Sequence, residues 1–320
     1  MPFSPLVVSP MPESSISRTT AYLLLIVAMA IAAGNPVVGR AVIEDVPPMA
    51  LTFWRFVAAA IALLPFGAAA MWRDRALLRR HAPLIGVLGV LGVGVYNAFL
   101  YLGVQTTTAI NASLIVGAVP VAAALLTVVM LRETPHWRRA VGVALGFLGI
   151  VVTIARGDLS VVLDLAFVLG DLLMLISALG FASYSVLLRK LPRGLHPVGF
   201  MLIIDLVALA GTTPFYAAEV AMGHRFDVTP DVIGAILYVG VMATAVSFSL
   251  YNVGVAAVGS PTASQFVYLA PVFTSLMAVV FLGENLRLYH GAGIALIFAG
   301  IYLSTTADRR QSANRETTGP

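Results

Sequence analysis

Two long stretches of this chain contain no charged side chain. Residues 82–131 and 232–283 hold no Asp, Glu, Lys or Arg. Each stretch is more than twice the roughly 20 residues that one membrane-spanning helix needs. Water-soluble helices carry charged residues on their exposed face, whereas helices surrounded by lipid do not need them. Each stretch therefore predicts two consecutive membrane-spanning helices.

The whole chain has the composition of a membrane protein. Of its 320 residues, 59% are hydrophobic and 11% are charged, against about 25% charged in a typical soluble domain. The mean hydropathy is +0.95. The net charge of +4 comes from basic residues placed between apolar segments, which indicates topology signals and no nucleic-acid partner. The absence of cysteine excludes disulfides and thiolate chemistry.

Pro, Gly and charged residues divide the apolar sequence into ten stretches of helix length. We place these spans at 19–39, 48–71, 83–104, 107–131, 137–155, 165–188, 197–218, 231–256, 261–282 and 288–306. Backbone polar groups in lipid must be satisfied within each segment, so all ten are predicted to be helices.

The basic residues between the spans predict the direction of insertion. Fourteen of the 19 Lys and Arg residues fall on the side that holds both chain ends, four fall on the other side, and Arg55 lies inside a span. Lys and Arg collect on the cytoplasmic side of membrane proteins. We therefore expect a multi-pass protein of the bacterial cytoplasmic (inner) membrane, with cytoplasmic N- and C-termini.

The chain also contains an internal repeat. An offset of 151 residues aligns Ser113 with Ser264, and an offset of 149 residues aligns Pro48 with Pro197. Because each copy holds five helices, an odd number, the second copy enters the membrane upside down. Inverted repeats of this kind allow alternating access in secondary transporters, although a duplication without a transport role is the alternative. The predicted parts are a polar N-terminal tail at 1–18, a first five-helix repeat at 19–155, a second, inverted five-helix repeat at 156–306 and a polar C-terminal tail at 307–320.

A motif recurs in the fourth predicted helix of each copy. It reads Ala112-Ser113-Leu114…Pro120-Val121…Leu131-Arg132-Glu133, and then Ala263-Ser264-Gln265…Pro271-Val272…Leu282-Gly283-Glu284. With the 5+5 arrangement, it resembles the EamA-type family of the drug/metabolite transporter superfamily, and most of all the YddG-type exporters of aromatic amino acids. The resemblance implies an all-α polytopic membrane protein of ten transmembrane helices around a central cavity, with the fifth helix of each half outside. It also implies export of amino acids or similar small metabolites.

Polar side chains fall on one face of the third and eighth predicted helices, which are repeat partners. Asn97 and Tyr101 are four residues apart, and Thr244, Ser247 and Tyr251 also follow at helical spacing. Such stripes suit the lining of a shared cavity, and tyrosines suit an amphiphilic substrate of amino-acid size. The remaining candidates for substrate binding are Asn35, Tyr96, Tyr184, Ser264, Gln265 and Tyr268. For the small hydroxyl residues, the alternative role is to hold neighbouring helices together.

Three ionisable residues lie inside predicted spans, where a charge usually faces a cavity or a partner. Arg55 and Asp171 are predicted at similar depth from the outer face, so we expect a salt bridge across the cavity. Asp205, nearer the midplane, is a candidate for a coupled proton or for contact with a substrate amine. A structural ion pair or a snorkelling side chain is the alternative for each of them.

Two prolines are hinge candidates because proline frees a helix carbonyl. They are Pro120 and Pro271, at matching positions of the fourth and ninth predicted helices. Kinked packing without a hinge is the alternative.

Other functions fit the sequence less well. The only lysine, Lys190, completes no GxxxxGK nucleotide-binding loop, which argues against a primary pump. No ring of like charges indicates a channel, and no paired carboxylates or Ser–His arrangement indicates an enzyme. We therefore expect a secondary transporter with no catalytic residue, cofactor or metal, whose partners are a small-molecule substrate and the lipid bilayer. Export of other metabolites or drugs, and then an integral membrane enzyme, are the alternatives. Proton coupling and oligomeric state are left open.

Overall fold

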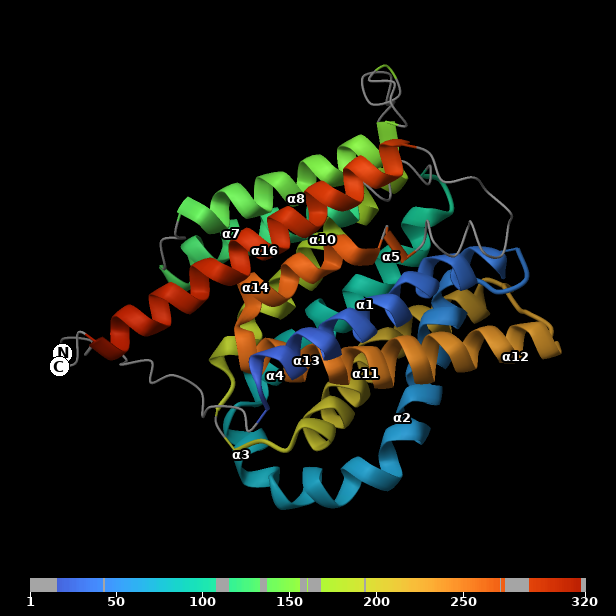
Figure 1. The fold of residues 1–320 in the computed structure, drawn as a ribbon. Coiled ribbons are helices and arrows are strands. Elements are labelled where there is room, and N and C mark those ends of the chain that lie inside the picture. Colours follow the sequence, from blue (N-terminus) through green and yellow to red (C-terminus); the bar gives the residue numbers. More distant parts are fainter. Residues whose placement is uncertain are drawn as a thin grey trace.

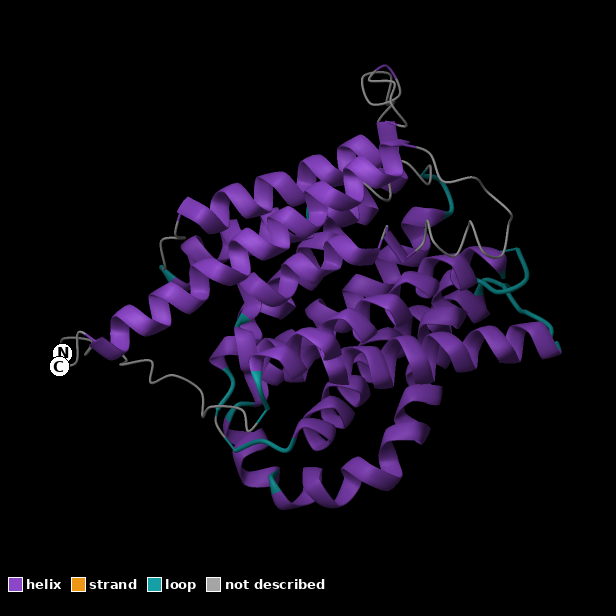
Figure 2. Ribbon diagram, viewed as in Figure 1, coloured by secondary structure: helices purple, strands orange, loops and turns teal. Residues whose placement is uncertain are grey.

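The computed structural model describes residues 16–42, 44–107, 115–132, 137–155, 160, 168–192, 194–270, 272–273 and 288–317. All regular secondary structure within these ranges is helical (Figure 2). The predicted all-α class is therefore confirmed for the described residues.

The helices lie side by side along one bundle (Figure 1). In the first half of the chain they are α1 (Arg18–Ala41), α2 (Pro48–Arg73), α3 (Arg75–Arg80), α4 (Ala82–Val87), η1 (Leu88–Val95), α5 (Tyr96–Val104), α7 (Val119–Leu131) and α8 (Trp137–Ala155). In the second half they are α10 (Leu169–Leu187), η2 (Leu188–Lys190), α11 (Pro197–Ala221), α12 (Pro230–Leu237), η3 (Tyr238–Val246), α13 (Ser247–Val258), α14 (Ser260–Gln265), η4 (Phe266–Tyr268) and α16 (Leu288–Thr317).

Six helices of the described part are long and apolar enough to cross a membrane. They cover Arg18–Gly39, Pro48–Arg73, Ala82–Val104, Leu169–Lys190, Pro197–Ala221 and Pro230–Val258, and each coincides with a predicted span. Shorter apolar helices at Ile115–Leu131 and Gly291–Ser304 fall within two further predicted spans. The chain is thus a polytopic helical membrane protein, while ten spans in two inverted sets around a cavity stay a prediction.

The last helix is longer than expected. α16 runs to Thr317, whereas the predicted span ends at 306 and gives way to a polar tail. The sequence after 306 is rich in Ala, Arg, Gln and Glu, and it has no Gly or Pro before Gly319. These residues favour helix in water as well as in lipid, so the end of the apolar stretch does not end the helix.

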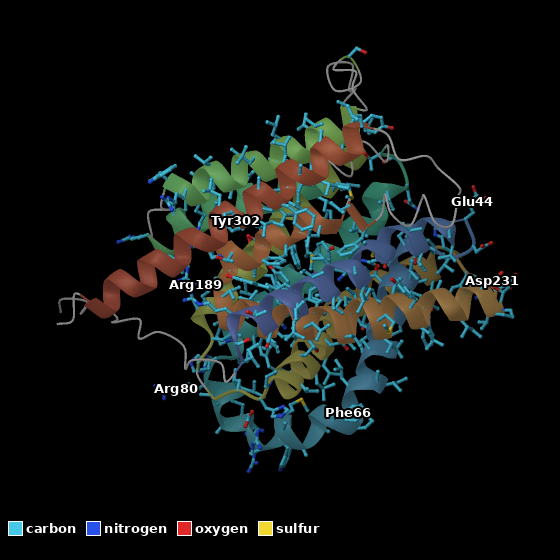
Figure 3. The ribbon with its side chains drawn as sticks, viewed as in Figure 1. Glu44, Phe66, Arg80, Arg189, Asp231 and Tyr302 are labelled. Carbon is cyan, nitrogen blue, oxygen red and sulfur yellow. The ribbon has the colours of Figure 1, made fainter. Side chains whose placement is uncertain are left out.

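The surface of the bundle is apolar between two charged ends. Phe66 and Tyr302 are 75% and 71% exposed. Figure 3 places them between one end of the bundle that carries Glu44 and Asp231 and an opposite end that carries Arg80 and Arg189. An apolar belt of this kind is typical of a surface that faces lipid. Which end faces the cytoplasm stays a prediction from the positions of the basic residues.

Helices α2 and α11 lie antiparallel, and each supplies an acidic residue to the start of the other. The Glu219 carboxylate, near the end of α11, accepts hydrogen bonds from the backbone N–H groups of Met49 (3.1 Å) and Ala50 (2.7 Å) at the start of α2. Asp74, just after α2, accepts a hydrogen bond from the backbone N–H of His196 (2.8 Å), immediately before α11. These carboxylates satisfy N–H groups that have no partner within their own helix.

Replacing Glu219 with alanine is expected to destabilise the protein by about 0.5–2 kcal/mol, the usual cost of losing a helix cap. The reason is that two buried N–H groups would lose their acceptor. Thermal unfolding in detergent measures the change. Asp227→Ala, at an exposed position beyond α11, is the matched control and should leave the midpoint unchanged. Equal effects of both variants would contradict the capping role.

Acidification is expected to loosen the other end of the α2–α11 pair. The N–H of His196, and then the neighbouring Arg73 guanidinium, hold the pKa of Asp74 below its usual value. A lowered folded-state pKa contributes stability above the usual aspartate pKa, and that stability is lost as the pH falls through the folded value. The unfolding midpoint of the wild type should therefore fall more than that of Asp74→Asn between pH 6 and about pH 3.5. Parallel decreases would show that Asp74 contributes nothing to the pH dependence.

Helices α8 and α16 cross closely through glycines at repeat-related positions (Figure 1). A Cβ atom added to Gly142 would lie 2.6 Å from the carbonyl oxygen of Gly300, and one added to Gly149 would lie 2.7 Å from that of Gly293. The offset of 151 residues aligns Gly142 with Gly293 and Gly149 with Gly300. Gly142 therefore faces the repeat partner of Gly149, and Gly149 faces the repeat partner of Gly142. The two helices are consequently antiparallel, with their backbones in contact.

The packing of the remaining helices is also reciprocal. α1 packs against α13 and η3, and α10 packs against α5 and η1. Likewise, η3 packs against α2 and η1 packs against α11. The first two long helices of each half thus pack against the third predicted span of the other half. This packing brings residues from both halves into contact inside the bundle.

Candidate functional site: a buried arginine beside an aromatic cluster

Arg55 is fully buried in α2 and bonds to three neutral side chains. Its Nε and Nη2 atoms donate to Thr244 Oγ1 at 3.0 and 2.7 Å. Its Nη1 atom donates to the Tyr101 hydroxyl at 2.6 Å and to Asn35 Oδ1 at 3.3 Å. The partners come from α1, α5 and η3, so both halves of the chain hold the guanidinium in place.

Arg55 forms no ion pair with an acidic side chain in the part of the chain that the structure describes. Within the described residues, no Asp or Glu lies at ion-pair distance from the guanidinium. The ring of Tyr101, with its centroid 5.5 Å from Cζ, adds a cation–π contact. Burial removes the water that would solvate the guanidinium, and neutral partners replace that solvation only in part. An anionic group bound beside Arg55 would therefore be stabilised by its charge.

The helix that carries Thr244 departs from α-helical geometry beside Arg55. The segment η3 is π-helical, and so is η1, which starts 150 residues earlier in the chain. Thr244 donates its hydroxyl to the carbonyl of Val239, five residues before it, at 2.7 Å. At Gly240 the backbone comes so near to α2 that a Cβ atom would lie 2.6 Å from the Arg55 carbonyl oxygen. π-Helical turns inside α-helices are frequent at functional sites.

Five aromatic side chains, here termed the aromatic cluster, lie between α5, α10 and α13. The cluster consists of Tyr96, Phe181, Tyr184, Phe248 and Tyr251. The ring centroid of Phe181 lies 5.1 Å from that of Tyr96, 5.2 Å from that of Tyr251 and 5.9 Å from that of Phe248. Tyr96 is half-buried, and the other four rings are buried. Tilted and edge-on arrangements at these distances are favourable for aromatic rings.

Two hydroxyl groups of the cluster, those of Tyr184 and Tyr251, form hydrogen bonds to polar side chains. Tyr184 donates to Asn252 Oδ1 at 2.7 Å. The hydroxyls of Tyr251 and Ser185 lie 2.7 Å apart, and those of Ser185 and Ser260 lie 2.9 Å apart. These bonds satisfy the buried phenols and join α10, α13 and α14.

Within the described residues, five side chains have buried oxygen atoms without a hydrogen-bond partner. They are both carboxylate oxygens of Asp205, Oδ1 of Asn97, Oε1 of Gln265, and the hydroxyl oxygens of Ser249 and Ser304. Buried polar atoms are nearly always bonded, so each exception needs an explanation. Asp205 is the most unusual because a carboxylate is far more costly to bury than an amide.

The sequence model of the EamA-like transporter family matches this chain twice, at residues 19–155 and 168–306. The chain belongs to this family. The two matches cover most of the sequence, including α2, α11 and both π-helical segments. Family membership therefore extends over the Arg55 site and the aromatic cluster.

Relatives of this EamA-like transporter are found in bacteria and archaea. An uncharacterized transporter of Archaeoglobus fulgidus is 28% identical over 91% of this chain and 98% of its own length. The uncharacterized transporter YyaM of Bacillus subtilis is 24% identical, over 79% of this chain and 83% of its own length. A probable terminal-alkyne amino-acid exporter of Streptantibioticus cattleyicolor is 29% identical, over 81% of this chain and 83% of its own length.

A solved crystal structure shares the fold. It superposes with a TM-score of 0.73, at 20% sequence identity, over 92% of this chain and 99% of that chain. Together, the family and the names of its members indicate a membrane transporter of small molecules. They do not single out the aromatic amino-acid branch that the motif resembles.

In this EamA-like chain, six of the predicted binding residues lie in the two groups described above. Asn35, Tyr101 and Thr244 bond to Arg55. Tyr96, Tyr184 and Tyr251 belong to the aromatic cluster. Asn97 lies one turn before Tyr101 on α5 and donates to the carbonyl of Val93 at 2.8 Å.

Four other predicted binding residues bond to backbone carbonyls. Ser247 bonds to Ala28 at 2.9 Å, and Tyr268 bonds to Val143 at 2.9 Å. Ser264 and Gln265 both bond to the carbonyl of Pro261, at 3.2 and 3.3 Å. The bonds of Ser247 and Tyr268 join different helices, which is the alternative role that small polar residues have in membrane proteins.

The expected salt bridge between Arg55 and Asp171 is wrong. Asp171 lies in the first turn of α10, where its carboxylate accepts a hydrogen bond from the backbone N–H of Val168 (2.8 Å) and one from the Thr107 hydroxyl. Similar depth does not imply proximity, because helices on opposite sides of a bundle share a depth. The N–H groups at the start of α10 offer Asp171 a favourable partner nearby.

Of the two hinge candidates, the structure describes Pro120 alone. Pro120 lies in the first turn of α7, where proline starts a helix without loss of a hydrogen bond. Pro271 lies outside the described residues. Prolines inside long helices include Pro65 in α2 and Pro214 in α11, at matching positions of the repeat.

Sequence reasoning missed two residues of the aromatic cluster, Phe181 and Phe248. Phenylalanines in a membrane helix are common, and neither one stands out by polarity. The available signal was helical spacing: Phe181 precedes Tyr184 by three residues, and Phe248 precedes Tyr251 by three.

Proposed function

We propose that this protein exports amino acids, aromatic and other neutral ones foremost, or similar small metabolites across the bacterial cytoplasmic membrane. It does so by alternating access between two inverted halves, 19–155 and 156–306. The observation that carries the proposal is the buried Arg55, which is held by side chains from both halves and has no acidic partner among the described residues.

Arg55 provides the binding group for a carboxylate. Guanidinium and carboxylate form paired, charge-assisted hydrogen bonds, which are stronger than bonds between neutral groups. The Nη2 atom has two N–H groups and makes one bond, to Thr244, among the described residues. A carboxylate that accepts from Nη2 would supply the negative charge that the cluster lacks.

The aromatic cluster favours a substrate with an apolar side chain. Its rings offer apolar and polarisable surface, and the hydroxyl groups of Tyr184 and Tyr251 are already bonded to Asn252 and Ser185. An aromatic or aliphatic group would therefore be accepted without leaving the phenols unpaired. The amino-acid exporter among the relatives supports this substrate class, and drugs or other metabolites that combine a carboxylate with an apolar body are the alternative.

The reciprocal packing supports alternating access. In an inverted repeat, the contacts that close one face of the membrane have counterparts that close the other. Glu219 and Asp74 are such counterparts, because they hold opposite ends of the same antiparallel pair, α2 and α11. Both contacts are formed in this structure, and the opening of one end at a time would expose Arg55 to each side in turn.

Uptake of radiolabelled amino acids by liposomes that contain the purified protein tests the function. We expect saturable uptake of phenylalanine, inhibited by an excess of unlabelled aromatic amino acids. Empty liposomes and liposomes with heat-denatured protein are the controls. Uptake no greater than in the controls, for every amino acid tried, would overturn the proposed substrate class.

A further inference from the structure

Asp205 is a buried carboxylate that makes no structural bond. It lies in the middle of α11 with 0% of its surface exposed, and neither of its oxygens has a hydrogen-bond partner among the described residues. The buried carboxylates of Asp171 and Glu219 each accept hydrogen bonds from backbone N–H groups. Asp205 is thus set apart from the acidic residues that cap helices.

Packing alone does not account for an aspartate at this position. Its neighbours along the helix are apolar, with Met201, Leu202 and Ile204 all buried. A hydrophobic side chain would fill the same space without the cost of a buried polar group. The buried, unpartnered carboxylate of Asp205 is therefore suited to bind a polar group of a ligand that enters the protein.

The partner must be positively charged or rich in N–H groups. Arg55 and Asp205 are both buried, on the helices α2 and α11 that pack against each other, yet the hydrogen bonds of Arg55 go to Thr244, Asn35 and Tyr101. The packed pair α2 and α11 thus carries one basic and one acidic buried side chain that form no ion pair with each other. A molecule that carries both charges can satisfy the two at once.

The aromatic cluster reaches the same part of α11. Tyr184 bonds to Asn252, and the amide nitrogen of Asn252 lies 3.7 Å from the sulfur of Met201. Met201 precedes Asp205 by four residues, so the two side chains lie one turn apart on one face of α11. The apolar part of a ligand at the cluster would then have its charged groups near Asp205 and Arg55.

We infer that Asp205 binds the ammonium group of the transported molecule while Arg55 binds its carboxylate, which makes the substrate class zwitterionic α-amino acids. This assignment rests on the proposed function and goes further by excluding amine-free acids as full substrates. It gives Asp205 the role of a substrate-binding residue.

Direct binding to the purified protein in lipid nanodiscs tests the assignment with three probes of one shape. Phenylalanine carries both charges, phenethylamine lacks the carboxylate and 3-phenylpropionate lacks the amine. Asp205→Asn should weaken the binding of phenylalanine and phenethylamine by about tenfold to a hundredfold, as expected for loss of one charged hydrogen-bond partner. The same variant should bind 3-phenylpropionate as well as the wild type does.

Asp227→Asn, which changes an exposed carboxylate outside the helices, is the matched control and should bind all three probes like the wild type. Equal weakening of the three probes by Asp205→Asn would overturn the assignment in favour of a structural role. Wild-type protein that binds 3-phenylpropionate as tightly as phenylalanine would also overturn it. Saturable uptake of phenylalanine in that case would leave the transport function standing, so the two failures are distinguishable.

Discussion

Replacing Arg55 with methionine is expected to abolish the uptake of carboxylate-bearing substrates while the protein still folds. Arg55 is the positive charge at the centre of the site, and its loss removes the donors that would hold a carboxylate. Loss of a charge-assisted bond of about 1.5–3 kcal/mol corresponds to roughly tenfold to a hundredfold weaker binding, and a paired contact loses more. Arg55→Lys keeps the charge without the planar fork and should retain part of the activity.

The fold is expected to survive because no partner of Arg55 depends on it alone. The Tyr101 hydroxyl also donates to Asn35 Oδ1 at 2.7 Å, and Thr244 also donates to the Val239 carbonyl. Methionine removes a buried charge and fills the space with a flexible apolar chain. Replacement of a buried charged group by an apolar side chain is often neutral for stability.

Uptake into liposomes and thermal unfolding in detergent, measured on the same preparations, separate the two effects. Thr52→Val is the matched control, because Thr52 is buried one turn before Arg55 and bonds to the Pro48 carbonyl of its own helix. It should transport normally. If Arg55→Met unfolds at a much lower temperature, or if it transports like the wild type, then Arg55 is a structural residue and not the carboxylate-binding group.

Gly300→Leu is expected to destabilise the protein by about 1–3 kcal/mol, or to prevent folding altogether. A Cβ atom at this position would lie 2.5 Å from the carbonyl oxygen of Gly142 and 2.8 Å from the backbone nitrogen of Gly146. Both atoms belong to the backbone of α8, so no side-chain rotation relieves the clash. The helices α8 and α16 would have to separate, and their close backbone packing would be lost.

Gly291→Leu provides a control on the same helix. Gly291 has no atom within 4 Å of the position that a Cβ would take, among the described residues. A leucine there faces open space and should change the stability by no more than about 0.5 kcal/mol. Thermal unfolding and the yield of monodisperse protein compare the two variants. If they behaved alike, the glycine contact between α8 and α16 would not contribute to stability.

The helices were predictable from the sequence because the bilayer imposes simple rules on it. Apolar stretches of about 20 residues had to be helical in lipid, and prolines such as Pro48 and Pro197 begin α2 and α11 where the spans were expected to begin. The end of α16 was misplaced because hydropathy reports where lipid ends and not where a helix ends.

The site was predictable only in part. Polar residues inside apolar spans stand out, so Arg55, Asn35, Tyr101 and Thr244 were all identified as candidates. Their mutual contacts were not predicted, because depth in the membrane gives one coordinate of the three that a contact requires. For that reason Arg55 was paired with Asp171, although its partners are neutral side chains.

The π-helical segments were not predictable. η1 is an apolar sequence with glycines, η3 is apolar apart from Tyr238 and Thr244, and both compositions fit an α-helix equally well. η1 packs against α11 and η3 packs against α2, so both segments contact residues far apart in the chain. Local propensity contains no information about such contacts.

Alternating access requires that the Arg55 site opens to each face of the membrane in turn. The chain has no cysteine, so Thr244→Cys introduces one thiol beside Arg55 with little change in size. A membrane-impermeant thiol reagent can then be applied to either face of the transporter in oriented vesicles. We predict labelling from each face, slowed by phenylalanine. Labelling from one face alone, or from neither under any condition, would contradict alternating access at this site.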